Sequence, residues 1–423
     1  MKYRLILSIL LLLSFQQSYS QKKEYAEKIL KTICSKDYHG RGYGLGADKK
    51  TANFIISELK KFNTKKFTQN YLQKYKLNTN TLCGKNDVVL NNKSLVPGID
   101  FLISASSNSI SGKFEVLELK KNIISNSSKL DSFIKQDFSN KVILIDTLGL
   151  NDKNFTDAYN LIIQRNVLKA KAIIKIEDGN LTYVPSQIQK KFPLIILHRN
   201  SYKEQIKTAN FDIEAKFLKD YNTQNIIAYI QGKSDTSIIL SAHYDHIGQM
   251  GINTYFPGAN DNGSGVSMVL TLAKYFSEHK IKPKYNIVFM FFSGEELGLL
   301  GSKYYSEHPL FLLSKIKFLI NLDMVGSGDK GIKVVNGSVF RKEFDKLSEI
   351  NTKNNYLPEV KIRGAAANSD HYFFYEKGVK SFFIYTLGEY KEYHNINDKY
   401  ENLPLNEFED LSYLLIDFIN SFK

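Results

Sequence analysis

The stretch from Ser237 to Asp323 constrains this 423-residue chain most strongly, because short apolar runs in it end abruptly in side chains that bind metals. The runs are SIILSAH, IVFMFFSGEE and IKFLINLD, and they end at His243, at Glu295-Glu296 and at Asp323. Their length and their β-branched and aromatic residues predict buried strands. Ligands of open α/β sheets bind outside the carboxyl ends of the strands, where several loops meet. We therefore expect these side chains to lie together at one edge of a sheet.

Two further segments supply residues of the same kind. The glycine-rich turn PGANDNGSG carries Asp261 into an amphipathic helix expected over residues 263–279. A later strand-like run, residues 381–387, is followed by Tyr393 and His394. Its design repeats that of the three earlier runs, so we expect His394 to reach the same edge of the sheet.

Together these side chains form a set that suits two metal ions. Hydrolysis of an amide near neutral pH needs an activated nucleophile, an electrophile for the carbonyl oxygen and a group that moves the proton. Two metals about 3.5–4 Å apart supply the first two when one carboxylate bridges them. We expect Asp261 to be the bridge, His243 and Asp323 to complete one site, and Glu296 and His394 to complete the other. Ligands made of histidine and carboxylate suit Zn²⁺, without excluding Mn²⁺ or Co²⁺.

The neighbours of these ligands have expected roles of their own. Glu295 and Glu296 are adjacent, so one can bind metal while the other takes a proton from water held between the metals. Asp245 follows His243 by two residues and fits a supporting role, in which it accepts the other imidazole N–H. His246 is interpreted as an ordinary loop histidine. Taken singly, each pattern is more often structural, and it is their occurrence together at strand ends that predicts a site.

The first 20 residues have the pattern of an export signal. Lys2 and Arg4 precede the apolar run Leu5–Leu13, and the small-x-small sequence SYS stands before Gln21. The apolar run is far shorter than the roughly 20 residues that a membrane span needs. We expect an exported protein, periplasmic or secreted, cleaved near Ser20 and Gln21 and without stable membrane insertion afterwards.

A chain of this length predicts two domains, or one domain with an insertion. We expect residues 21–103 and 222–423 to form the catalytic domain and residues 104–221 to be a small inserted α/β domain. The inserted section alternates strand-like and helix-like stretches (KVILIDTL, DAYNLIIQRNVLK, KAIIKI) and has no cluster of carboxylates or histidines. It covers the substrate, binds a partner or acts as a spacer, and the sequence leaves these roles open.

Charge and cysteine content exclude little by themselves. The formal charge is +14, but lysines are spread over the whole chain without an arginine-rich run, which argues against a nucleic-acid partner. Cys34 and Cys83 are compatible with one disulfide or with two separate thiols. In the segment HGRGYGLGA we expect a mobile or tightly turned loop in which His39 and Arg41 have structural roles, the alternative being that they face the active site. The oligomeric state is not predicted.

Six motifs, taken in order, resemble those of a known family. HYDHIG, GANDNGSG, SGEELGLLGS, NLDMVG, SDHYFF and YHNIND look like the successive motifs of the family 28 metallopeptidases, over about residues 222–423. The resemblance implies a mixed central β-sheet flanked by helices on both faces, the three-layer fold of zinc aminopeptidases. It also implies that residues 104–221 are similar to a protease-associated domain.

The family includes secreted di-zinc aminopeptidases, and its relatives include glutamate carboxypeptidase and the glutaminyl cyclases. By resemblance, the chain binds two Zn²⁺ and removes N-terminal residues from peptides with a free N-terminus. Glu295 is then the general base, Glu296 a ligand, Asp261 the bridge and Tyr393 a hydroxyl that steadies the tetrahedral intermediate. Asp370, in SDHYFF, is expected to support the metal ligands without binding a metal itself. The alternatives are a single-zinc cyclising acyltransferase, a carboxypeptidase or dipeptidase on the same scaffold, and an inactive binding module.

Overall fold

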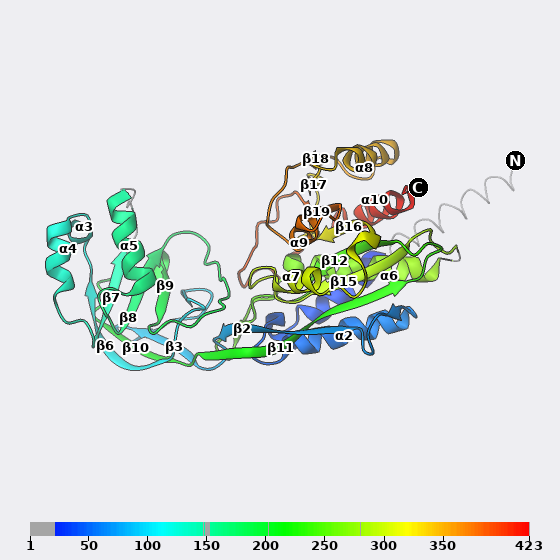
Figure 1. Ribbon diagram of the computed structural model, residues 1–423. Coiled ribbons are helices and arrows are strands. Elements are labelled where there is room, and N and C mark those ends of the chain that lie inside the picture. Colours follow the sequence, from blue (N-terminus) through cyan, green and yellow to red (C-terminus); the bar gives the residue numbers. More distant parts are fainter. Residues whose placement is uncertain (1–21, 147, 149–152, 202, 280, 423) are drawn as a thin grey trace, which may run out of the picture.

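The computed structural model describes residues 22–146, 148, 153–201, 203–279 and 281–422. The expected signal sequence, residues 1–20, lies outside the described residues. Two sheets organise the molecule, and the long strands β2 (Leu72–Thr81) and β11 (Lys216–Ile230) run between them (Figure 1). In the part of the chain that the structure describes, no helix is both long and apolar enough to cross a bilayer.

Among the described residues, nine strands form the first sheet, in the order β1-β11-β15-β12-β16-β19-β17-β18 with β2 paired to β11. The other strands are β1 (Lys65–Lys66), β15 (Asn286–Phe292), β12 (Ser237–His243), β16 (Ile316–Leu322), β19 (Ser381–Thr386), β17 (Ile332–Val335) and β18 (Val360–Ile362). The four central strands β15, β12, β16 and β19 are parallel, whereas β11 and β17 run antiparallel to their central neighbours. The carboxyl ends of all four central strands therefore meet at one edge.

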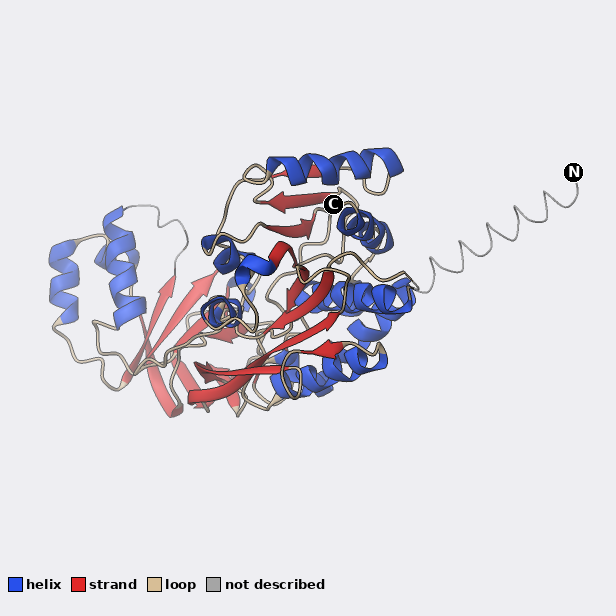
Figure 2. Ribbon diagram, turned by 45° about the vertical axis from the view of Figure 1, so that its right-hand side comes forward, coloured by secondary structure: helices blue, strands red, loops and turns tan. Residues whose placement is uncertain are grey.

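Helices cover both faces of this sheet (Figure 2). Successive residues of a strand point to opposite faces, so Ile238 and Ile239 of β12 enter two different cores. The core containing Ile238 is covered by α2, α6, α8, α10 and the helix over residues 22–33, and that containing Ile239 by α7 and α9. The helices are α2 (Ala47–Lys61), α6 (Gly265–Glu278), α7 (Leu300–Glu307), α8 (Arg341–Asn354), α9 (His371–Glu376) and α10 (Phe408–Asn420). This architecture confirms the predicted fold class, a mixed sheet with helices on both faces.

The second sheet contains eight strands of the described part, in the order β4-β3-β10-β6-β7-β8-β9-β5. They are β3 (Asn86–Leu90), β4 (Lys93–Ser94), β5 (Phe101–Ile103), β6 (Ile110–Glu118), β7 (Lys141–Asp146), β8 (Ala172–Glu177), β9 (Leu194–His198) and β10 (Thr208–Ile213). The helices α3 (Lys121–Ile124), α4 (Ser127–Ile134) and α5 (Lys153–Arg165) lie beside it. The sheet begins well before the expected boundary at residue 104, because β3 pairs with β10 and β5 pairs with β9. Local sequence patterns do not reveal such long-range pairing.

The second sheet is packed onto the chain that carries the candidate ligands. Ile247, Met250 and Phe256, which follow β12, are buried in the core of the second sheet. The rings of Tyr183 and Phe256 stack with centroids 5.1 Å apart. A shared apolar core fixes this part of the second sheet against the first, next to the carboxyl end of β12.

Candidate active site

The structure brings the expected ligands together at the carboxyl ends of the central strands. His243 is the last residue of β12, and Asp323 directly follows β16. The Nε2 atom of His243 lies 3.2 Å from Oδ1 of Asp261 and 3.4 Å from Oδ1 of Asp323. These three residues are buried, so they form a compact group of donors shielded from water.

A second group shares the same aspartate. The Nε2 atom of His394 lies 2.9 Å from Oδ2 of Asp261 and 3.0 Å from Oε2 of Glu296. One carboxylate oxygen of Asp261 therefore faces His243 and the other faces His394. Within the candidate groups His243–Glu295–Asp323 and His246–Asp261–Glu296–His394, ligand atoms lie within 4.8 Å of one another. The position of Asp261 between the groups is the one that a bridging carboxylate needs.

Two residues hold the turn that carries Asp261. The Asp398 carboxylate accepts hydrogen bonds from the backbone N–H of Asn260 at 2.8 Å and of Asp261 at 3.0 Å. On the other side, the buried guanidinium of Arg41 donates to the backbone carbonyl of Asp261 at 3.0 Å. Gly258 precedes the turn with φ of 61°, and a Cβ atom there would lie 2.3 Å from the His246 ring. The predicted structural role of Arg41 is thus to fix the backbone of the turn.

Glu295 and Glu296 lie in a turn. The sequence after Gly-Glu-Glu predicts a helix from Glu296 to Glu307, and the predicted beginning of that helix is wrong. The helix α7 begins at Leu300. Gly294, Gly298 and Leu299 have φ of 73°, 99° and 61°, and such left-handed residues interrupt a helical path. The turn points the two adjacent carboxylates to different places, because Glu296 faces His394 while Oε2 of Glu295 lies 3.8 Å from Nε2 of His243.

Asp245 supports the site in a different way from the expected one. The Nδ1 atom of His243 lies 3.1 Å from the backbone oxygen of Asp245, whereas the carboxylate oxygen Oδ1 is 3.8 Å away. The backbone carbonyl is thus the nearer acceptor for the imidazole N–H. The carboxylate instead accepts hydrogen bonds from Tyr43 Oη at 2.8 Å and from the backbone N–H of Glu295 at 3.3 Å. Burial raises the pKa of Asp245 to about 6.

Sequence reasoning missed two residues that touch expected ligands. His246, interpreted as a loop histidine, is buried with Nδ1 2.6 Å from Oε1 of Glu296. Ser369 donates a hydrogen bond to Oδ2 of Asp323 at 2.8 Å. His246 lies in the motif HYDHIG, in which His243 and Asp245 were the residues predicted to belong to the site. Ser369 lies in SDHYFF, in which Asp370 was the predicted residue. Asp370 itself is fully buried, and burial raises its pKa to about 7.

Tyr393 is a partly exposed neighbour of the expected ligand His394. Its side chain is 44% exposed, and its ring stacks on that of His394 with centroids 3.9 Å apart. Burial of the rest of the residue and the nearby carboxylates of Asp261 and Glu296 raise the pKa of the phenol, so it stays protonated at neutral pH. A neutral hydroxyl beside the ligands can donate a hydrogen bond to a substrate oxygen.

The donor set fits divalent cations. Asp261, Glu295, Glu296 and Asp323 place carboxylates in one mostly buried region, and such a cluster is unfavourable without compensating positive charge. Burial lowers the pKa of His394, but Glu296 and Asp261 outweigh this and raise it to about 11. The carboxylates thus favour the positively charged form of His394, although its imidazole is buried. Histidine and carboxylate donors in this arrangement suit zinc.

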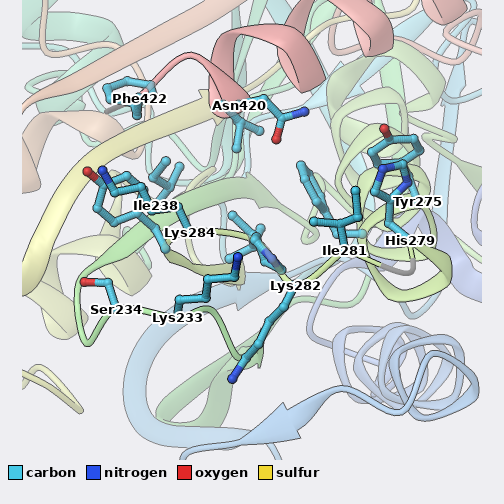
Figure 3. Close-up of a pocket in the computed structure, with 15 residues that line it drawn as sticks. Lys233, Ser234, Ile238, Tyr275, His279, Ile281, Lys282, Lys284, Asn420 and Phe422 are labelled. Atoms are coloured by element: carbon cyan, nitrogen blue, oxygen red, sulfur yellow. The ribbon is translucent and has the colours of Figure 1, made fainter.

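A surface pocket of about 750 Å³ lies elsewhere. Ile238 and Ile287, near the amino ends of β12 and β15, belong to its lining, so it is at the opposite edge of the sheet from the ligands. Figure 3 shows exposed lysines, among them Lys233 and Lys282, around it. None of the expected ligands lines this pocket.

Cys34 and Cys83 are both free thiols in the described structure.

Comparison with known proteins places this arrangement in a family. The model of peptidase family M28 matches residues 225–419. A vacuolar membrane protease of Lodderomyces elongisporus is 36% identical over 119 residues, which are 28% of this chain and 12% of that protein. Leucine aminopeptidase 1 of Trichophyton rubrum is 34% identical over 170 residues, 37% of this chain and 46% of that protein. The chain thus spans less than half the length of these curated relatives.

Solved structures share the fold over nearly the whole chain. A zinc aminopeptidase from Bacillus subtilis superposes with a TM-score of 0.69 at 21% identity, covering 93% of this chain and 94% of that one. A peptidase M28 precursor from Shewanella amazonensis gives a TM-score of 0.64 at 15% identity, covering 96% of both chains. The order of the motifs, the sheet that carries them and the match to the family model all indicate the same family. Residues 225–419 of this chain belong to peptidase family M28.

Proposed function

We propose that the chain is an exported di-zinc aminopeptidase that removes N-terminal residues from peptides. The observation that carries this proposal is the position of Asp261, whose two carboxylate oxygens face His243 and His394 at 3.2 and 2.9 Å. One zinc would be held by His243, Asp261 and Asp323, and the other by Asp261, Glu296 and His394. Zinc at such sites polarises a carbonyl oxygen and lowers the pKa of water to roughly 7.

Glu295 is the proposed general base. Its carboxylate lies beside His243 and Asp323 without being needed as a ligand, and Oε2 is 3.8 Å from Nε2 of His243. Burial raises its pKa well above the usual value, with the charges of Asp323 and Asp370 adding to the effect. A carboxylate with a raised pKa takes a proton readily and can then donate it to the leaving amine. Tyr393 is the proposed donor of a hydrogen bond from its hydroxyl to the oxyanion that forms.

The proposed substrate class rests on the family resemblance. Aminopeptidases of the family hold the substrate's free amine near the metals, which favours substrates with a free amine over blocked ones. Leucine aminopeptidases among the relatives and a zinc aminopeptidase among the structures support this choice. Export is proposed from the pattern of residues 1–20, and the protease-associated nature of the second sheet from the resemblance of residues 104–221.

The experiment that tests the proposal uses the mature chain and aminoacyl chromogenic amides, each with a free or an acetylated amine. Activity is measured with zinc, with a chelator and for the variant Glu295→Gln. We expect cleavage of the free-amine series alone, its loss on chelation, and a fall in kcat of at least about 10²-fold in the variant, which still binds two metals. Metal per chain is counted by elemental analysis.

Two results would change the assignment. If the chain binds two metals but leaves every free-amine substrate intact, the aminopeptidase proposal fails, and cyclisation or carboxy-terminal trimming are tested next. One zinc per chain together with cyclisation of N-terminal glutamine would instead support an acyltransferase of the glutaminyl cyclase type.

A further inference from the structure

We propose that residues 181–188, called here the cleft segment, form a wall of the substrate site and that Val184 contacts a substrate side chain next to the scissile bond. The segment belongs to the second sheet, where it leads from β8 to β9. This inference rests on the proposed aminopeptidase function and adds to it a residue that selects among peptides.

The cleft segment is tied to the backbone on both sides of the candidate ligands. The backbone N–H of Tyr183 donates to the carbonyl of His394 at 2.9 Å. Four residues later, Nε2 of Gln187 donates to the carbonyl of Leu297 at 2.6 Å. His394 and Glu296, the neighbour of Leu297, are the pair whose side chains meet at 3.0 Å. The segment therefore runs past this pair, with Val184 between the two points of attachment.

Further contacts hold the segment in place. The backbone N–H of Asn80 in β2 donates to the carbonyl of Ser186 at 2.9 Å, and Nε2 of Gln189 donates to Oδ1 of Asn80 at 2.9 Å. Tyr183 is buried and stacks on Phe256. With one end packed in a core and the other paired to a strand, the segment is a fixed wall that needs no movement to take up its position.

Val184 is directed away from the core that holds its neighbours. Leu181 and Tyr183 are buried in the core of the second sheet, whereas Thr182 and Val184 are exposed. This alternation is the one expected of an extended chain. Val184 is 62% exposed, although it adjoins a residue bonded to the backbone of His394. An exposed apolar side chain at this place is available to a substrate bound over the ligands.

The chemistry of the segment indicates what it selects. In a chain with 24% charged residues, the run from 179 to 189, GNLTYVPSQIQ, contains none. A neutral, partly apolar wall stabilises an apolar side chain by burying it and offers no opposite charge to a charged one. We therefore expect a preference for apolar residues on at least one side of the scissile bond.

The test compares the zinc-loaded chain with Val184→Asp and with Val339→Asp, a control at an exposed valine in the turn before α8. The substrates are free-amine dipeptide amides in which either position is leucine or lysine. In Val184→Asp we expect the leucine-to-lysine ratio of kcat/KM to fall about 10-fold or more at one position, since burial of an apolar group accounts for 10–200-fold discrimination. The ratio stays unchanged in Val339→Asp, and metal per chain stays the same in both variants.

The outcomes are distinct. An unchanged ratio at both positions, in a wild-type chain that does cleave these amides, overturns the role of Val184 and leaves the aminopeptidase function standing. Equal loss of turnover for all substrates, or loss of metal, would mean that the substitution disturbs the site and not the selection, which also overturns it. A wild-type chain that cleaves none of them removes the proposed function, and this inference with it.

Discussion

His246 and Glu296 form the tightest side-chain contact around the candidate ligands, with imidazole Nδ1 2.6 Å from carboxylate Oε1. The other oxygen of the same carboxylate, Oε2, lies 3.0 Å from Nε2 of His394. Since a carboxylate accepts hydrogen bonds, Nδ1 of His246 is the donor. This bond holds one oxygen of Glu296 and turns the other toward the proposed metal position, as second-sphere partners of metal ligands do.

We predict that His246→Ala weakens the binding of one of two zinc ions by about 10–100-fold, because Glu296 loses the group that orients it. His246→Asn retains an N–H donor at a similar place and should lose less. Stepwise competition with a chromogenic chelator measures both affinities. His279→Ala, at an exposed histidine directly after the end of α6, is the control and should behave as wild type. Unchanged affinities in His246→Ala would refute the positioning role.

Tyr393→Phe removes one hydroxyl and leaves the ring stacked on His394. If this hydroxyl donates to the oxyanion, we expect kcat to fall by about 10²–10³-fold with little change in KM, because the bond strengthens only in the transition state. Steady-state kinetics on a leucyl amide gives both constants. Tyr229→Phe in β11, on the far side of the sheet, is the matched control. A rise in KM alone would instead assign Tyr393 to ground-state binding.

Arg41 is a buried cation held by backbone carbonyls. Its guanidinium donates to the carbonyls of Tyr244, Pro257, Gly258 and Asp261 at distances of 3.0, 2.6, 2.8 and 3.0 Å. We predict that Arg41→Met lowers the free energy of unfolding by on the order of 3 kcal/mol, since several buried acceptors lose their donors. Arg41→Lys should restore little, because one ammonium cannot span four carbonyls.

Denaturant unfolding of the zinc-free chain measures this effect. Arg341→Met serves as the control, because Arg341 lies on the exposed face of α8, where a substitution changes stability by less than about 0.5 kcal/mol. Equal stability of Arg41→Met and wild type would show that water replaces the guanidinium in the turn.

The buried carboxyl group of Asp370 should make the stability of the metal-free protein depend on pH. Burial raises its pKa from 3.8 to about 7, so between these values the folded chain binds more protons at this residue than the unfolded chain. The contribution of Asp370 to stability therefore falls as pH rises from about 4 to 7 and is flat above. Asp370→Asn removes this penalty, and we expect it to stabilise the metal-free chain at pH 8 by on the order of a few kcal/mol.

The comparison is made by thermal unfolding in chelator at pH 4 and pH 8. The gain in Tm of Asp370→Asn over wild type should be present at pH 8 and absent at pH 4. It should shrink when zinc is added, because nearby positive charge stabilises the ionised carboxylate. A gain that is equal at both pH values would assign the effect to packing and not to ionisation.

The sequence was sufficient to predict the central sheet and the residues expected at its edge. His243 ends a buried strand, Asp323 and the two glutamates follow such strands, and parallel strands have their carboxyl ends on the same side. Local pattern and sheet geometry therefore predict which side chains converge, and the structure places Asp261 and His394 among them. The prediction of a helix from Glu296 rested on a local pattern alone, and it was wrong because residues with left-handed φ in the turn prevent a helix from beginning there.

Other features depended on tertiary structure alone. The bond from His246 to Glu296 joins residues 50 positions apart, and Arg41 reaches the Asp261 turn from the N-terminal part of the chain. The strands before residue 104 join the second sheet through β10 and β9, and the cleft segment meets His394 through one backbone bond. The sequence determines strands and charged strand ends, since these follow from short apolar runs and the residues that end them. Contacts between distant segments depend on how the two cores pack, and no local pattern encodes that packing.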